Sequence, residues 1–66
     1  MQNNLKKTRK DAGLTQKEVA ERCGITEGAY QKYEYNKRVP ILFIALKIAK
    51  VLNSKVEILF QLEDQE

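Results

Sequence analysis

The sequence is poor in the residues that build metal sites and covalent cross-links. It has no histidine and a single cysteine, Cys23, among 66 residues. One cysteine excludes an internal disulfide, and without histidine no zinc-ligand spacing remains, so we expect neither a metal nor a cofactor. The sequence also lacks a nucleophile–base pair and a phosphate-binding loop, and so short a chain has little room for a closed pocket. We therefore expect no enzymatic activity and no small-molecule ligand.

Long apolar runs are missing as well. The longest, residues 40–46, is far too short to span a membrane, and the N-terminal sequence MQNNLKKTRK is polar and basic, unlike a signal peptide. The lone cysteine fits a reducing compartment. These absences together predict a cytoplasmic protein that does not associate with membranes.

What remains is a short, basic chain. Twelve lysine and arginine residues against nine acidic ones give a formal net charge of +3. Three of the acidic residues lie in an acidic tail, residues 61–66, and outside it the basic residues exceed the acidic ones by six. This excess suits a polyanion such as nucleic acid, although solubility alone also explains it. The length allows one domain, residues 1–66, whose small core would gain stability from dimerisation.

Apolar periodicity and boundary residues divide the chain into short helices. Thr15 and Glu18 predict a capping box at the start of one helix, Gly24 ends that helix, and Thr26 begins the next. A second capping box is predicted at residues 54–57. We expect helices at residues 3–12, 15–23, 26–35, 41–52 and 54–60, followed by an extended tail at 61–66.

The last of these segments has an ambiguous period. Residues 56–62 fit a helix through the spacing of Val56, Leu59 and Phe60. They also fit a strand, through the alternation of Val56, Ile58, Phe60 and Leu62. The predicted capping box favours a short helix, and both readings stay open. Five short helices with tight connections predict a compact all-α domain.

The fourth helix, which we expect Pro40 to start, is apolar on most of its surface. Its core-facing stripe is predicted to contain Leu42, Ala45, Leu46, Ile48, Ala49 and Leu52. Further apolar residues exceed what one face needs, so we expect a two-fold dimer interface. The residues assigned to this interface are Ile41, Phe43 and Ile44, joined by Leu59, Phe60 or Leu62.

Residues 16–35 form the most informative unit. Two short capped helices joined by a tight glycine-containing turn describe a helix-turn-helix. Ala20 is small where the second helix must approach closely, and Gly24 permits the positive φ of the turn. The core between the helices is predicted to contain Val19, Cys23, Ile25, Tyr30 and Tyr33.

Three stretches carry a family resemblance: NLKKTRKDAGLTQKEVAERCGIT, then YEYNKRVP, then LKIAKVLN. Together with Glu34 at the end of the third helix and the basic loop into Pro40, they resemble the Cro/repressor-like, or XRE, helix-turn-helix proteins. The resemblance implies a lambda-repressor-like domain of five helices. It also implies that the third helix lies in the major groove of double-stranded DNA while the second crosses the backbone.

The resemblance assigns contacts residue by residue. It implies base contacts by Glu27, Gly28 and Lys32, in which Lys32 donates to guanine and Glu27 accepts from cytosine. Gln31 is a secondary candidate, for a base or for the DNA backbone. It implies contacts to the DNA backbone by Gln16, Lys17, Thr26, Tyr35, Lys37 and Arg38. It further implies a structural ion pair between Arg9 and Glu34, which ties the first helix to the third.

This sequence departs from the family pattern at three positions. Glu27 places a negative charge near phosphates, Gly28 leaves one readout position without a side chain, and Ile41 replaces the usual serine or threonine cap after the proline. These departures bear on the DNA sequence that is read rather than on the fold.

Two functions from different classes are compatible with this pattern. The first is a sequence-specific transcriptional regulator, a repressor that binds a palindromic operator as a homodimer through residues 26–35. The second is an antitoxin-like or anti-regulator module that binds another protein, with the tail ILFQLEDQE as the contact. Removing Lys32 and Lys37 discriminates between them, because only the first needs their charges.

Overall fold

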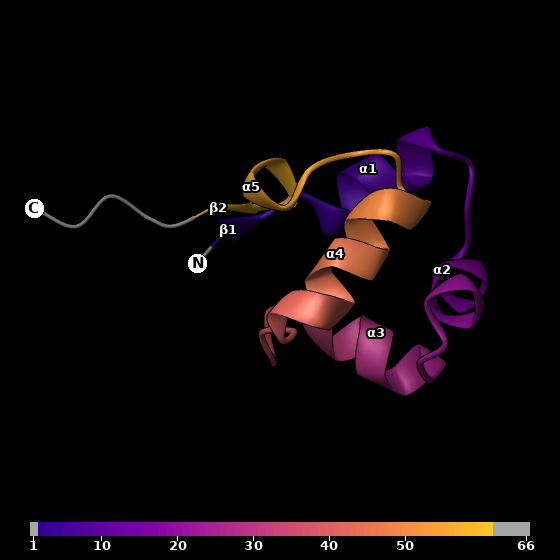
Figure 1. Ribbon diagram of the computed structural model, residues 1–66. Coiled ribbons are helices and arrows are strands. Elements are labelled where there is room, and N and C mark those ends of the chain that lie inside the picture. The colour runs from indigo at the N-terminus through magenta and orange to yellow at the C-terminus, as the bar shows by residue number, and fades with distance from the viewer. Residues whose placement is uncertain (1, 62–66) are drawn as a thin grey trace, which may run out of the picture.

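A computed structural model describes residues 2–61, and within them it contains five helices and one two-stranded ladder (Figure 1). The helices are α1 (Leu5–Asp11), α2 (Gln16–Cys23), α3 (Glu27–Glu34), α4 (Leu42–Val51) and α5 (Val56–Leu59). The strands are β1 (Gln2–Asn3) and β2 (Phe60–Gln61). The predicted five-helix, all-α fold is confirmed. No helix in this part of the chain is long and apolar enough to cross a membrane.

The boundaries of α2 and α3 follow the sequence signals. The Thr15 hydroxyl accepts from the Glu18 N–H at 3.1 Å and the Glu18 carboxylate accepts from the Thr15 N–H at 2.8 Å, which confirms the capping box. Gly24 ends α2 at a φ of 72°, a conformation that glycine adopts without steric penalty. Thr26 then caps α3 by accepting from the Ala29 N–H at 3.1 Å. The two helices are therefore joined by the tight turn that the sequence predicts.

The capping box predicted at residues 54–57 is wrong. The helix α5 begins at Val56, and no described side chain caps it. The Ser54 N–H instead donates to the Ala49 carbonyl at 2.8 Å, after Asn53 has taken a φ of 53°. Ser54 thus belongs to the turn that ends α4. The local sequence does not show whether such a residue ends one helix or caps the next.

The two ends of the described chain pair with each other, which the sequence did not predict. Gln2 lies opposite Gln61 and Asn3 lies opposite Phe60 in an antiparallel register. Consequently the helix predicted from residue 3 begins only at Leu5, and the extended segment starts one residue earlier than predicted. Strands of two residues are too short for periodicity to detect. The rest of the predicted tail lies outside the described residues.

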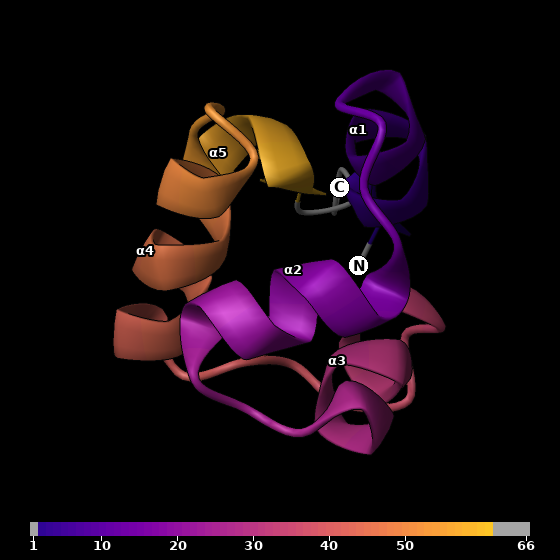
Figure 2. The same ribbon diagram turned by 90° about the vertical axis from the view of Figure 1, so that its right-hand side faces the viewer.

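All five helices contribute to the core (Figure 2). The largest of the fully buried side chains, each at most 1% exposed, are those of Leu5, Val19, Cys23, Tyr30, Ile48 and Leu59. Burial raises the pKa of the Cys23 thiol, which therefore stays neutral and packs as a small apolar group. Fully burying an aliphatic side chain contributes about 1.5–3 kcal/mol. A few such residues thus hold together a helix as short as α2.

One side of α4 packs on the core and the other faces solvent. Its buried residues Ala45, Ile48 and Ala49, and the buried Leu52 just after it, agree with the predicted stripe. Leu42 and Leu46 do not, because they are 68% and 52% exposed, so their predicted burial is wrong. The predicted stripe was wider than the single neighbouring surface that the fold offers to this helix.

The start of α4 also differs from the prediction. Pro40 is buried but lies outside the helix, which begins at Leu42 after Ile41. No described side chain forms a cap bond at Ile41, as its apolar side chain requires. The first turn of α4 is therefore held by packing rather than by a polar cap.

Candidate nucleic-acid interface

The helix α3 has one buried side and one exposed side. Tyr30, Tyr33 and Glu34 face the interior. The opposite side carries Glu27, Gly28, Gln31, Lys32 and, just after the helix, Tyr35. Positions four residues apart stack on one face of a helix, so these five residues form a single outward surface, here called the α3 face. Gln31 is half-buried and the other four are exposed.

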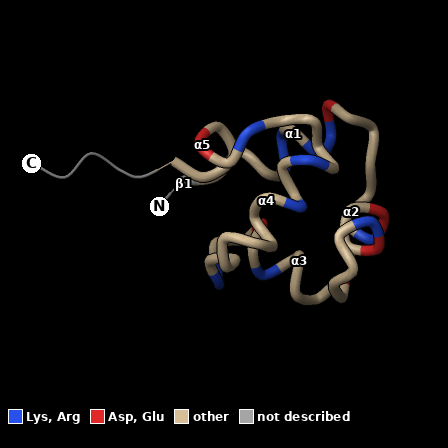
Figure 3. Tube along the Cα trace, viewed as in Figure 1, with Lys and Arg blue, Asp and Glu red and all other residues tan. Residues whose placement is uncertain are grey.

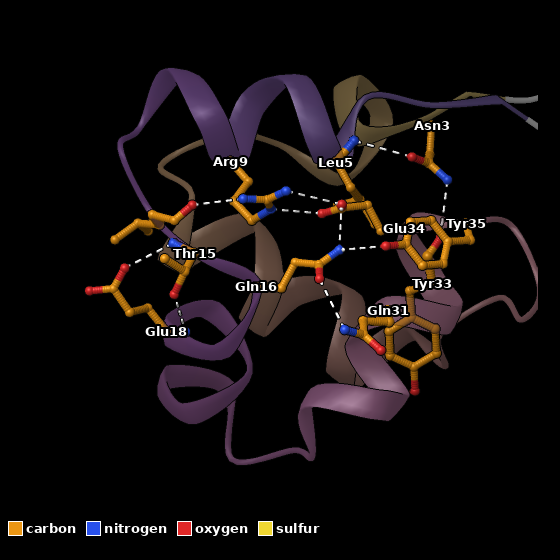
Figure 4. A network of polar contacts seen from close by, with 11 residues as sticks. Asn3, Leu5, Arg9, Thr15, Gln16, Glu18, Gln31, Tyr33, Glu34 and Tyr35 are labelled. Carbon is orange, nitrogen blue, oxygen red and sulfur yellow. Dashed lines mark hydrogen bonds and ion pairs between the residues drawn. The ribbon is translucent and has the colours of Figure 1, made fainter.

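An ion pair at the base of the α3 face connects three elements. Arg9 Nε lies 2.8 Å from Glu34 Oε2, and Arg9 Nη2 lies 3.1 Å from Glu34 Oε1. A third N–H of Arg9 donates to the Leu14 carbonyl at 2.8 Å (Figure 4). The Glu34 side chain is fully buried and that of Arg9 is 10% exposed. Arg9 thus ties α1 and the connection to α2 onto the end of α3, in the pairing that the resemblance implied.

The charge state of this pair follows from its contacts. Burial alone raises the pKa of Glu34, but the hydrogen bonds from Arg9 and Gln16 outweigh it, and the pKa lies below its ordinary value. The hydrogen bond to Glu34 likewise raises the pKa of Arg9. Both groups are therefore ionised at neutral pH, and the Glu34 carboxylate acts purely as an acceptor.

Gln16, at the start of α2, lies between this ion pair and the α3 face (Figure 4). Its Nε2 donates to Glu34 Oε1 at 2.8 Å and to Tyr35 Oη at 3.3 Å. Its Oε1 accepts from Gln31 Nε2 at 3.1 Å. The sequence analysis assigned Gln16 to a phosphate and did not predict these bonds. Its partners lie 15 to 19 positions away, beyond the reach of any local motif.

The basic loop after α3 folds back onto that helix. The backbone N–H groups of Lys37 and Arg38 both donate to the Lys32 carbonyl, at 2.8 and 3.3 Å. The chain turns at Asn36, whose φ is 62°, as a left-handed helix stop requires. Both basic side chains are exposed. The fold therefore sets two cations immediately beyond the α3 face.

Asn3 holds this loop from the other end of the chain. Its Nδ2 donates to Asn36 Oδ1 at 2.9 Å and to the Tyr33 carbonyl at 3.1 Å. The β1–β2 ladder places Asn3 beside the end of α3, more than 30 residues away along the chain. The sequence analysis missed this role because nothing near Asn3 in the sequence signals a contact with the third helix.

The charges around the α3 face are mostly positive. Lys17 at the start of α2, Lys32 on α3 and the two cations of the basic loop are all exposed, and Glu27 is an exposed acidic residue at the start of α3. Figure 3 shows positions of both signs on α2. Thr26 is exposed too, although its hydroxyl oxygen is engaged as the cap of α3. An α-helix with its side chains is about 10–12 Å across, which matches the roughly 12 Å width of the DNA major groove. Within residues 2–61, no group of acidic, cysteine and histidine side chains is placed to hold a metal ion.

The residues assigned to a dimer interface do not all lie on one surface. Ile41 and Phe43 are exposed, and Ile44 and Phe60 are half-buried. Leu59, the last residue of α5, is fully buried in the core, so its assignment to an interface is wrong. Leu62 lies outside the described residues.

Exposed apolar residues gather instead at the start of α4. Val39, Ile41, Leu42, Phe43 and Leu46 are between 52% and 69% exposed, and we call them the α4 patch. Val39, Leu42 and Leu46 were not predicted to be interface residues. The apolar residues at 39–46 indicated a surplus of apolar surface, but only the fold shows which of them remain exposed.

The sequence of this chain is similar to those of known helix-turn-helix proteins. The helix-turn-helix family model matches residues 5–59. A Bacillus subtilis protein named as an uncharacterized HTH-type transcriptional regulator, YqaE, is 38% identical over 63 residues, which are 96% of this chain and 54% of that protein. This chain thus spans about half the length of that relative.

Two archaeal proteins with the same description match along nearly their full lengths. The one from Methanocaldococcus jannaschii is 38% identical over 66 residues, covering 100% of both chains. The one from Archaeoglobus fulgidus is 35% identical over 66 residues, covering 100% of this chain and 94% of the relative.

Proposed function

This chain belongs to the XRE-type helix-turn-helix family, and from that membership we propose that it binds double-stranded DNA and regulates transcription. The observation that carries the proposal is the α3 face. Its exposed side chains are polar or charged, and its helix is anchored from behind by Tyr30, Tyr33 and the ion pair of Glu34. A rigid helix with a polar outer face is suited to reading base edges.

The α3 face provides the base contacts in this proposal. Lys32 donates to guanine O6 and N7, and Glu27 accepts from the amino group of cytosine. Gln31 contacts a base through its amide. Gly28 lets the backbone of α3 come close to the floor of the groove, since it has no side chain to hold the helix away.

The surrounding residues provide the backbone contacts. Lys17, Thr26, Tyr35, Lys37 and Arg38 lie around α3 and face phosphates when that helix enters the groove. Such contacts set affinity and its salt dependence, while the base contacts set sequence preference. Gln16 borders this set, but both N–H groups of its amide are already engaged by Glu34 and Tyr35.

We further propose that the chain acts as a homodimer and as a repressor. The α4 patch supports a second copy, because a cluster of five apolar side chains on a domain this small favours association. A two-fold axis through this patch presents two α3 helices to a palindromic operator, with half-sites about 34 Å apart. A dimer bound at an operator that overlaps a promoter represses by excluding polymerase from it.

Selection of bound sequences from a random duplex pool, at defined salt, tests the proposal. We expect one enriched motif with two inverted half-sites centred about ten base pairs apart. An enriched motif without symmetry contradicts the dimer but keeps the DNA-binding function. No enrichment over the starting pool contradicts sequence-specific binding and leaves the protein-binding alternative.

A further inference from the structure

We propose that Gln16 is a positioning residue that fixes the outward polarity of Gln31 and so determines which base Gln31 reads. This inference rests on the proposed function, because it concerns how α3 meets DNA. It replaces the phosphate contact that the sequence analysis assigned to Gln16. A chain of hydrogen bonds runs from the buried ion pair through Gln16 to the surface (Figure 4).

The chain starts at Glu34, whose carboxylate has one possible polarity. It is fully buried and pairs with Arg9, so it is ionised and offers only acceptors. Gln16 approaches Glu34 Oε1 to 2.8 Å and must therefore present an N–H to it. The ion pair thus dictates which end of the Gln16 amide points inward.

The orientation of Gln16 passes to Gln31. With its nitrogen held by Glu34, Gln16 presents its oxygen to α3, where Gln31 Nε2 donates to it at 3.1 Å. Gln31 must therefore direct its nitrogen toward Gln16. The Gln31 oxygen and the second N–H are then left for the outer side.

Gln16 imposes a polarity on Tyr35 as well. The second N–H of Gln16 donates to Tyr35 Oη at 3.3 Å, so the tyrosine hydroxyl acts there as an acceptor. Its own proton is free to point outward, and a phosphate oxygen is the matching acceptor. Both N–H groups of Gln16 are thereby engaged, so a phosphate contact by Gln16 itself requires one of these bonds to break.

The oriented Gln31 amide matches one base best. An acceptor and a donor side by side complement adenine, whose major-groove edge offers the N6 amine and the N7 acceptor. Without Gln16, the Gln31 amide turns freely and presents either order of donor and acceptor, so the preference weakens. A well-placed bidentate pair discriminates against the wrong base by roughly 5- to 150-fold.

The test compares Gln16→Met, Gln31→Met and the double variant on the selected operator. Methionine retains the length and packing of glutamine but cannot form these hydrogen bonds, and circular dichroism melting confirms that each variant folds. Affinity is measured for the operator and for versions substituted at the base pair where Gln31→Met loses discrimination. We expect Gln16→Met to lose discrimination at that same pair by at least about half as many decades as Gln31→Met. The double variant should lose no more than Gln31→Met alone.

The salt dependence separates positioning from a phosphate contact. Gln16→Met should leave the slope of affinity against salt unchanged. The matched control is Lys17→Met, on the next residue of α2, which should lower that slope by about one and weaken all sequences equally. If Gln16→Met weakens all sequences alike, or if its effect adds to that of Gln31→Met, the proposal is overturned.

A measurement without DNA distinguishes this inference from the proposed function. In the free protein, the Gln31 side-chain amide resonances should shift on Gln16→Met and stay in place on Lys17→Met. Unchanged resonances overturn the hydrogen-bond chain even if the protein binds DNA. If they shift while the wild-type protein binds no duplex, the chain of bonds stands, but the proposed function fails, and the base-reading role fails with it.

Discussion

The α3 face and the α4 patch are both exposed, but their chemistry is opposite. The α3 face is polar and charged, and a buried ion pair and two tyrosines hold its helix from behind. The α4 patch is apolar, and it lies at the start of α4, which no described side chain caps. Exposed polar groups held rigidly suit a hydrated partner such as DNA, whereas exposed apolar groups suit a protein surface. Exposure alone therefore does not identify a binding site. The α3 face differs from the α4 patch in the buried residues that anchor its helix.

The largest expected effect comes from removing the support of the α3 face. Glu34→Ala leaves Arg9 nearly buried without its partner, and breaking a buried ion pair in this way costs about 3–5 kcal/mol. We expect the free energy of unfolding in urea to fall by that amount. Glu27→Ala, which removes an exposed carboxylate from the same helix, should change it by less than about 0.5 kcal/mol. Equal effects of the two substitutions would contradict the anchoring role of the ion pair.

The next largest effect should separate the α4 patch from the α3 face. Leu42→Ser removes an exposed apolar side chain, and we expect the dimer dissociation constant to rise by about 10-fold or more, as it does at a central interface residue. Sedimentation equilibrium at several concentrations measures it. Leu42 is preferred to Phe43 because the Lys47 ammonium lies 4.7 Å from the Phe43 ring centroid within the monomer.

Ile58→Ser is the matched control for the patch. Ile58 is 48% exposed but lies on α5, outside the α4 patch. The dimer should be unaffected by this substitution. If Ile58→Ser dissociates the dimer and Leu42→Ser does not, the interface lies on α5 and the two-region contrast fails.

Substituting Lys32, on the α3 face, and Lys37, in the loop beyond it, should change DNA binding in different ways. Lys32→Ala is expected to cost about 1–3 kcal/mol at one base pair per half-site and to relax the preference there. Lys37→Ala should weaken all sequences alike and lower the salt slope by about one. Gel shifts on a set of singly substituted operators measure both. If Lys32→Ala changed affinity uniformly, its assignment to a base would be wrong.

The pH dependence of stability tests the role of Glu34 in anchoring the α3 face. Because the pKa of Glu34 is lower in the folded protein than its ordinary value, the unfolded chain takes up a proton first as the pH falls. The stability from this carboxylate is present above the ordinary glutamate pKa of about 4.3 and is lost as the pH falls through the folded value. Thermal melting of the wild type should show this loss. Glu34→Gln should flatten the acid dependence, and an equally steep decline would assign it to other carboxylates.

The smallest expected effect is that of substituting Gly28, which should change stability and DNA binding in opposite directions. Apart from its chain neighbours and the backbone of its own helix, no described atom lies within 4 Å of a Cβ built there. Glycine in a helix costs about 0.5–1 kcal/mol relative to alanine. Gly28→Ala should therefore stabilise the fold by up to that amount, measured by urea unfolding. It should nevertheless weaken DNA binding, because the added methyl group holds α3 away from the groove. Unchanged DNA affinity would show that the backbone at Gly28 does not approach the bases closely.

The sequence predicted the features that depend on neighbouring residues. The capping box at Thr15, the cap at Thr26 and the left-handed turn at Gly24 were all predicted, because each is fixed within four residues. Contacts between distant residues were not predictable. The bonds of Gln16 to α3 and of Asn3 to Asn36 depend on how the helices pack, and no local pattern encodes them.

The family resemblance supplied part of what local patterns could not. It brought Arg9 and Glu34 together across 25 positions of sequence, and the structure contains that pair. It could not divide the apolar run of α4 between core and surface. Leu42 and Leu46 have the spacing of buried residues, and they are exposed because α2 and the rest of the core cover only one side of that helix.

Mapping the DNA contact surface by NMR tests the central claim most directly. The ¹⁵N-labelled protein is titrated with the selected operator duplex, and backbone and side-chain amide shifts are followed. We predict that the largest shifts fall on residues 26–38 and on the start of α2, while the exposed residues of the α4 patch change little at a protein concentration where the free chain is already dimeric. Large shifts confined to α4 and α5, with the α3 face unchanged, would contradict the account.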